Sequence, residues 1–147
     1  MNRILVSVVA AVGMFLSACI TLVREMPLDS VEKGKDASYA LAVKVLESVL
    51  KNDPSGLYEL LTPELRSQFD SKEFENSLET VKKSVGEPET YQFLTRLEMT
   101  TLQPYVWKIR CKHKNVMTGE EHYNEVMFRV IIGITEKGPI VLAYNFL

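Results

Sequence analysis

The chain has 147 residues, a net charge of −2 with its histidines neutral, 46% hydrophobic residues and 24% charged residues. This length suits one domain, and the composition excludes long disorder and a coiled coil. The slightly acidic balance lacks the basic footprint of a protein that binds nucleic acid. We therefore expect one globular domain with no nucleic-acid partner.

The N-terminus has the layout of an export signal. Arg3 supplies a positive start, an almost unbroken apolar run covers residues 4–16, and Ser17 and Ala18 are small. These three parts in this order are typical of a leader that is removed after export. Cys19 follows the small pair directly, and the stretch LSAC resembles the lipobox of bacterial lipoproteins.

That resemblance implies that residues 1–18 are a lipoprotein signal peptide and that the thiol of Cys19 is acylated, which anchors the chain in a membrane of the cell envelope. Ile20 stands where inner-membrane lipoproteins often have Asp, so the resemblance favours the periplasmic side of the outer membrane. An uncleaved signal anchor is the alternative, because residues 4–23 carry no charge and are about long enough to cross a bilayer. Both interpretations put the domain on the same side of the membrane.

The acylated cysteine is expected to begin a tether over residues 19–35, because charges, Pro27 and Gly34 are mixed there without a period. The folded domain is then expected over residues 36–147. Cys111 has no disulfide partner once Cys19 is acylated, so we expect a buried and inert thiol.

Three helices are predicted at the start of this domain. Asp36 is expected to cap the first helix, whose apolar residues recur at helical spacing up to Leu50. A short second helix follows, and the chain restarts at Pro63, a residue tolerated in a first helical turn. Ser71 is expected to cap the third helix, which stops at Gly86.

After the third helix the apolar period changes to two, which predicts four strands, over residues 91–99, 105–114, 126–132 and 140–147. A turn centred on Thr118-Gly119 puts Trp107 and Ile109 on the face of Phe128. The expected fold is α+β, with three N-terminal helices packed on one face of a curved four-stranded antiparallel sheet.

Residues 41–81 resemble the opening of small exported domains in the nuclear-transport-factor-two-like, or cystatin-like, superfamily, and the element order agrees over residues 38–147. The motifs that carry the resemblance are Asp53, Tyr58, Leu60, Leu61 and the stretch 71–74. The superfamily's usual extra hairpin between the helices has no counterpart here, so a deep pocket is not implied. Because the superfamily includes enzymes, ligand binders and scaffolding domains, the fold does not choose the function.

One cluster of potential metal ligands falls on the core face near the end of the predicted hairpin. Its members are Cys111, His113, His122 and Asn124. Cys-x-His opposite a cross-strand His is a zinc-like pattern, but it falls short of the usual four ligands. We favour histidines at the wet rim of the sheet, and we expect no metal and no other cofactor.

A basic stripe occupies the opposite face of the second predicted strand. Its members are Lys108, Arg110, Lys112 and Lys114. This stripe is a candidate contact surface for anionic head groups, peptidoglycan or an acidic partner. Glu121 and Glu125 on the next strand offer counter-charges, and a solvated, paired face is the favoured interpretation.

Aromatic residues between helix and sheet are the candidate pocket. The residues proposed for it are Tyr39, Tyr91, Trp107, His113 and Tyr144. At these spacings aromatic side chains more often form a core, which is the interpretation we favour. The chain also lacks HExxH, a Gly-rich phosphate loop and a nucleophile elbow.

The sequence therefore favours a lipid-anchored, non-enzymatic binding or assembly module of the periplasm. We expect it to act on an envelope protein or a cell-wall component. The alternative is a small-ligand-binding or enzymatic domain that uses a cavity between the helices and the sheet.

Overall fold

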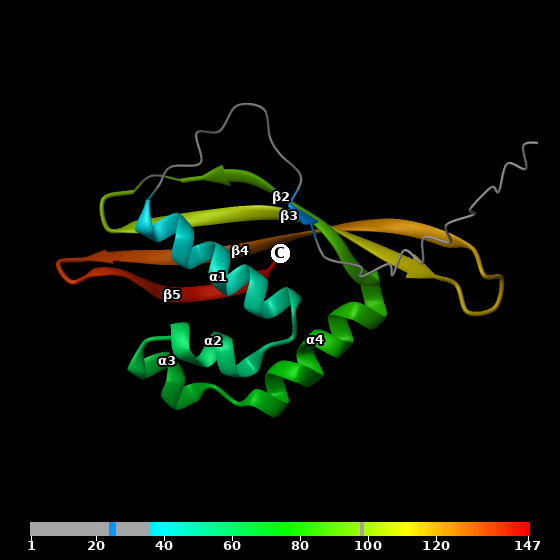
Figure 1. The fold of residues 1–147 in the computed structure, drawn as a ribbon, viewed down its shortest axis with the longest axis horizontal. Coiled ribbons are helices and arrows are strands. Elements are labelled where there is room, and N and C mark those ends of the chain that lie inside the picture. The colour runs from blue at the N-terminus through cyan, green and yellow to red at the C-terminus, as the bar shows by residue number, and fades with distance from the viewer. Residues whose placement is uncertain (1–23, 26–35, 98) are drawn as a thin grey trace, which may run out of the picture.

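The computed structural model describes residues 24–25, 36–97 and 99–147, so the predicted leader, Cys19 and most of the predicted tether lie outside the described residues. The elements are β1 (Arg24–Glu25), α1 (Ala37–Leu50), α2 (Pro54–Leu60), α3 (Pro63–Gln68), α4 (Ser71–Val85), β2 (Glu87–Arg96), β3 (Leu102–Lys114), β4 (Glu121–Thr135) and β5 (Gly138–Phe146). Strands β2 to β5 form a curved antiparallel sheet with α1 lying across one face (Figure 1), which confirms the α+β class.

The number of N-terminal helices was predicted wrongly, because the described residues contain four. The second predicted helix is broken at Leu61, which has extended backbone angles. Thr62 is also extended, as expected of a residue before proline, and its hydroxyl accepts the N–H of Leu65. The chain therefore ends one short helix and begins another.

The helix caps agree with the prediction at α1 and differ at α4. Asp36 caps α1, and its carboxylate accepts the N–H of Ser38 at 2.9 Å. At α4 the cap is Asp70 and not Ser71, which already belongs to the helix. Both carboxylates satisfy backbone N–H groups that a first helical turn leaves without partners.

The sheet has the order β1-β2-β3-β4-β5, and the two-residue β1 pairs in parallel with β2. The predicted sheet had four strands, and β1 adds a fifth inside the segment predicted to be a tether. Trp107 lies opposite Phe128, which moves the centre of the β3–β4 turn from Thr118-Gly119 to Met117-Thr118. This shift displaces the cross-strand pairs by two residues, so every side chain keeps its predicted face.

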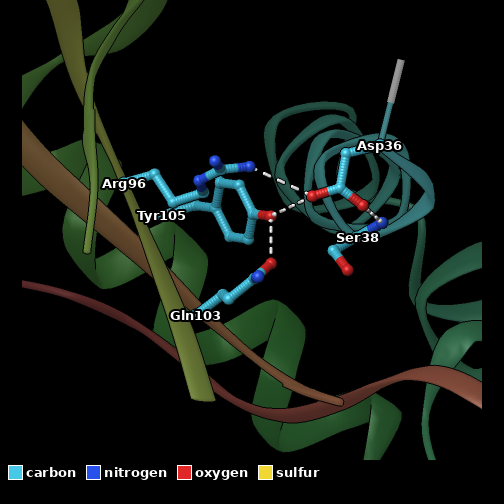
Figure 2. Close-up of polar contacts among 5 residues, drawn as sticks. All are labelled: Asp36, Ser38, Arg96, Gln103 and Tyr105. Atoms are coloured by element: carbon cyan, nitrogen blue, oxygen red, sulfur yellow. Dashed lines mark hydrogen bonds and ion pairs between the residues drawn. The ribbon is translucent and has the colours of Figure 1, made fainter. Parts of the chain in front are cut away.

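The core lies between α1 and the sheet. Its largest fully buried side chains are Trp107, Tyr105, Phe128, Leu46, Leu57 and Ile109. Figure 2 shows how the start of α1 is attached to the sheet: Asp36 Oδ2 is 3.1 Å from Arg96 Nη1 and 3.4 Å from the Tyr105 hydroxyl. Asp36 thus caps α1 and also connects the helix to β2 through an ion pair and to β3 through a hydrogen bond.

Helix α4 ends against the hairpin formed by β3 and β4. Gly86 has a φ of 102°, and a Cβ there would collide with the backbone of Lys112 and His113. Asn124 adds a hydrogen bond of 2.9 Å from its side-chain amide to the Val85 carbonyl. Among the described residues, no helix is both long and apolar enough to span a bilayer.

Replacing Gly86 with Ala is therefore expected to destabilise the domain far more than replacing Gly119 with Ala. Gly119 also has a positive φ, of 73°, but open space surrounds it. The Gly119 change should cost about 1–2 kcal/mol of left-handed strain, and the Gly86 change several kcal/mol in total, because β3 or α4 must also move. Urea unfolding followed by the fluorescence of Trp107, the single tryptophan, measures the unfolding free energy of both variants. Equal losses of stability would contradict the close approach of Gly86 to the backbone of β3.

Candidate functional site

The space under α1, where a packed core was favoured over a candidate pocket, is filled with aromatic rings. The Tyr39 ring lies 5.3 Å from that of Phe93, 5.9 Å from that of Tyr105 and 6.3 Å from that of Trp107. Tyr105 and Trp107 are fully buried, and Tyr91 is 7% exposed. Three of the predicted pocket residues therefore belong to the packed core.

The other two predicted pocket residues lie elsewhere. His113 is near the end of β3, beside the C-terminal end of α4 and opposite His122 on β4. Tyr144 is on β5, opposite Val130. His122 and Val130 are separated by about 26 Å along β4, at about 3.3 Å per residue. The structure does not bring the five residues into one site.

A groove runs between α4 and the end of β5. Its inner part is a cavity of about 120 Å³, lined mainly by Phe74, Leu78, Val81, Phe128, Tyr144 and Phe146. Its outer part measures about 270 Å³ and shares Phe74, Ser77 and Tyr144 with the inner part. Burial in this groove raises the pKa of the Tyr144 hydroxyl, which keeps it neutral. The groove is the candidate functional site.

The outer part of the groove has an acidic rim. Asp70 and Glu73 both line it and are exposed, and the lining of neither part includes a lysine or arginine. One oxygen of Asp70 is occupied, because it accepts the N–H groups of Lys72 at 2.8 Å and Glu73 at 2.9 Å. The rim is therefore negative while the floor is apolar.

Three residues of the basic stripe interact with acidic or aromatic side chains on β4. Lys108 is 3.1 Å from Glu125, and Lys112 is 2.8 Å from Glu121. The contact with Glu121 raises the pKa of Lys112, and the same contact lowers the pKa of Glu121. Arg110 lies over the Tyr123 ring, 3.9 Å from its centroid. Lys114, the last member, pairs in register with Glu121.

Comparison with solved structures identifies the architecture. A ketosteroid isomerase-like protein from Erwinia carotovora atroseptica matches with a TM-score of 0.50 and 13% identity, over 74% of this chain and 91% of that chain. The domain has an NTF2-like fold. A protein of the NTF2-like family from Streptomyces avermitilis matches with a TM-score of 0.42 and 10% identity, over 71% of this chain and 88% of that chain.

A SEC-C motif containing protein from Rhodopseudomonas palustris also matches, with a TM-score of 0.43 and 13% identity, over 68% of this chain and 70% of that chain. No family model matches the sequence, and no curated protein matches it. At these identities the likeness extends to the fold alone, and the NTF2-like domain must be assigned a function from its own surfaces.

Sequence reasoning missed an exposed apolar tip on the NTF2-like domain. Val116 and Met117, at the β3–β4 turn, are 96% and 93% exposed. Asn115 holds this turn, because its side-chain oxygen accepts the N–H groups of Met117 at 2.9 Å and Thr118 at 3.2 Å. Two adjacent apolar residues inside a turn were the signal in the sequence.

The candidate cluster of metal ligands, which we expected to hold no metal, is split by burial. His113 and His122 face each other with ring centroids 4.9 Å apart. Cys111 is 3% exposed, and Asn124 is bonded to the end of α4. In the part of the chain that the structure describes, no three metal-binding side chains gather. Desolvation by burial, with a smaller contribution from Glu87, raises the pKa of the Cys111 thiol from 9.0 to about 11.

The raised pKa predicts a pH dependence of stability. Since the folded protein holds the Cys111 proton more tightly than the unfolded chain, the thiol contributes fully below pH 9 and its contribution is lost between about pH 9 and pH 11. The difference in unfolding free energy between wild type and Cys111→Ala should therefore shrink over this window, by about 1–3 kcal/mol. Urea unfolding at pH 8 and pH 10.5 measures it, and a constant difference would contradict the burial of the thiol.

Proposed function

We propose that this protein is a lipid-anchored module of the bacterial cell envelope that acts by binding a protein partner and performs no catalysis. Acylated Cys19 would hold the NTF2-like domain at the periplasmic side of a membrane, the outer membrane being favoured by Ile20. A cell-wall component is the other partner class for the same module.

The observation that carries this proposal is the filled interface under α1. A small-molecule pocket usually holds about 300–1,000 Å³ and contains a few converging polar groups. The inner part of the groove between α4 and the sheet holds about 120 Å³, and its only polar lining residues are Ser77, Tyr144 and Asn145. A metabolite therefore has little space in the core, and we expect a partner to bind at the surface of the domain.

Two of those surfaces suit a protein. The exposed tip at Val116 and Met117 presents apolar side chains on a held turn, and the groove beside α4 has an aromatic floor. Exposed apolar patches that are rimmed by polar residues commonly mark interaction sites. The alternative, a small-ligand-binding or enzymatic domain, would have to use an open surface hollow. The outer groove holds about 270 Å³, and the neighbouring hollow on α4, lined by Asp70, Lys72, Glu73 and Asn76, holds about 370 Å³.

The anchor is tested by replacing Cys19 with Ser. Labelling of cells with radioactive palmitate should mark the wild-type chain and leave the variant unlabelled, because the serine hydroxyl cannot form the thioether to diacylglycerol. Cys111→Ala is the matched control and should keep its label, since that thiol is buried in the core. Unchanged labelling of the Cys19 variant would defeat the anchor.

Binding to a partner is tested by crosslinking in intact cells with a photoreactive residue in place of Met117. We expect one discrete crosslinked species with an envelope protein, and no such species with the photoreactive residue at Glu79, an exposed position on α4. A metabolite extracted from the purified chain, with no crosslink at any surface position, would favour the ligand-binding alternative.

A further inference from the structure

Strand β5 is an edge strand whose last residues turn main-chain groups outward. The Leu147 N–H donates to the Met127 carbonyl at 2.9 Å, and Asn145 lies opposite Arg129. In an antiparallel pair, residues that bond the partner strand alternate with residues whose N–H and C=O point away from it. The main-chain groups of Tyr144 and Phe146 therefore point away from the sheet.

One of these four groups already has a partner. The Asn145 side-chain amide donates to the Phe146 carbonyl at 2.9 Å, and Arg129 holds the Asn145 oxygen through two contacts of 3.2 and 3.1 Å. Earlier along β5, Val141 forms a parallel bridge with Leu61. Within the described residues, the open part of the edge is the Tyr144 N–H, the Tyr144 C=O and the Phe146 N–H.

The groove lies on the side-chain face of this same open edge. Tyr144 and Phe146 both line the inner groove, where Phe74 of α4 is also present. An added strand has the same two-residue period as β5, so every second side chain of such a strand would enter the groove. The inner cavity of about 120 Å³ suits one aliphatic side chain.

The next groove-facing position of an added strand would meet the acidic rim, about 6.6 Å further along. Asp70 and Glu73 line the outer groove with Phe69. The groove lining itself contains no basic residue, and Lys72 lies with both carboxylates in the neighbouring hollow on α4. A lysine or arginine complements this end, because its apolar stem can lie on the aromatic rings while its charge meets the carboxylates.

We propose that the Tyr144–Phe146 edge of β5 and the adjoining groove bind an extended peptide segment of a partner protein by strand addition. The segment carries an aliphatic residue for the inner cavity and a lysine or arginine two residues away for the rim. Main-chain bonds to Tyr144 and Phe146 supply affinity, and the two side chains supply specificity. This inference rests on the proposed function, because it names the chemistry of the protein partner.

The test uses the full-length chain in detergent micelles and a synthetic peptide, acetyl-Lys-Thr-Leu-Thr-Lys-amide. Its central leucine has a lysine two residues away on both sides. One lysine can therefore reach the acidic rim whether the peptide runs parallel or antiparallel to β5. At saturating peptide, hydrogen exchange of the Tyr144 and Phe146 amides should slow by about tenfold or more. Lack of binding, or binding that leaves these amides unprotected, would overturn strand addition.

Charge recognition at the rim is tested with matched variants of α4. Glu73→Lys should weaken binding of the lysine peptide by about tenfold, whereas Glu79→Lys, the same charge change at an exposed position outside the groove lining, should not. The peptide with glutamate in place of both lysines should bind the wild type more weakly. Equal effects of the two protein variants would overturn the role of the rim.

Main-chain pairing is separated from side-chain binding by N-methylation of the peptide. An added strand bonds β5 through alternate residues only, so methylating the leucine nitrogen and methylating both threonine nitrogens should have clearly unequal effects. Equal effects would argue for a groove that binds side chains alone and would overturn the inference.

Failure of this inference can be distinguished from failure of the proposed function. If the peptide does not protect β5 but the photoreactive residue at Met117 still captures an envelope protein, the strand-addition site is excluded and the binding module stands. If neither surface binds a protein, the proposed function falls as well.

Discussion

The burial of aromatic side chains from β2 and β3 under α1 is the constraint on which the rest of this NTF2-like domain depends. Tyr39 reaches down from α1 onto Phe93, Tyr105 and Trp107, and the contact of Asp36 with Arg96 attaches the first turn of α1 at the same place. Each fully buried aromatic contributes about 1.5–3 kcal/mol relative to exposure, so this packing outweighs any single surface contact. The same packing removes the space in which a ligand pocket would form.

The filled core moves the accessible apolar surface to the margins of the domain. Helix α4 meets the sheet near Gly86, where it contacts the backbone of β3, and the groove opens between its earlier residues and β5. The hairpin of β3 and β4 continues beyond the end of β5 and presents its exposed tip there. Both surfaces are exposed because the helices do not cover the whole sheet at these places. The extent of that cover depends on how the helix layer packs on the sheet.

The basic stripe shows why charge in a sequence is a weak indicator of a binding surface. Alternating cations on β3 suggest an electropositive face, yet Lys108 and Lys112 each have a carboxylate on β4 within 3.1 Å. Exposed pairs of this kind contribute little to stability, about 0–1 kcal/mol, but they neutralise two of the four cations of the stripe. Within the described residues, Asp70 and Glu73 at the rim of the groove form no such ion pair, although Lys72 lies nearby, so the rim is the better candidate for charge recognition.

The sequence by itself determined the α+β class, the Asp36 cap and the faces of the β3 and β4 side chains, because caps and side-chain periods are local properties. It indicated the restart at Pro63 but did not count a separate helix there, and it could not give the parallel pairing of β1. Only the tertiary structure decided the groove, because Phe74 comes from α4 and Tyr144 from the last strand. It also decided which main-chain groups stay open on β5, since that depends on hydrogen bonds between strands that no local pattern records.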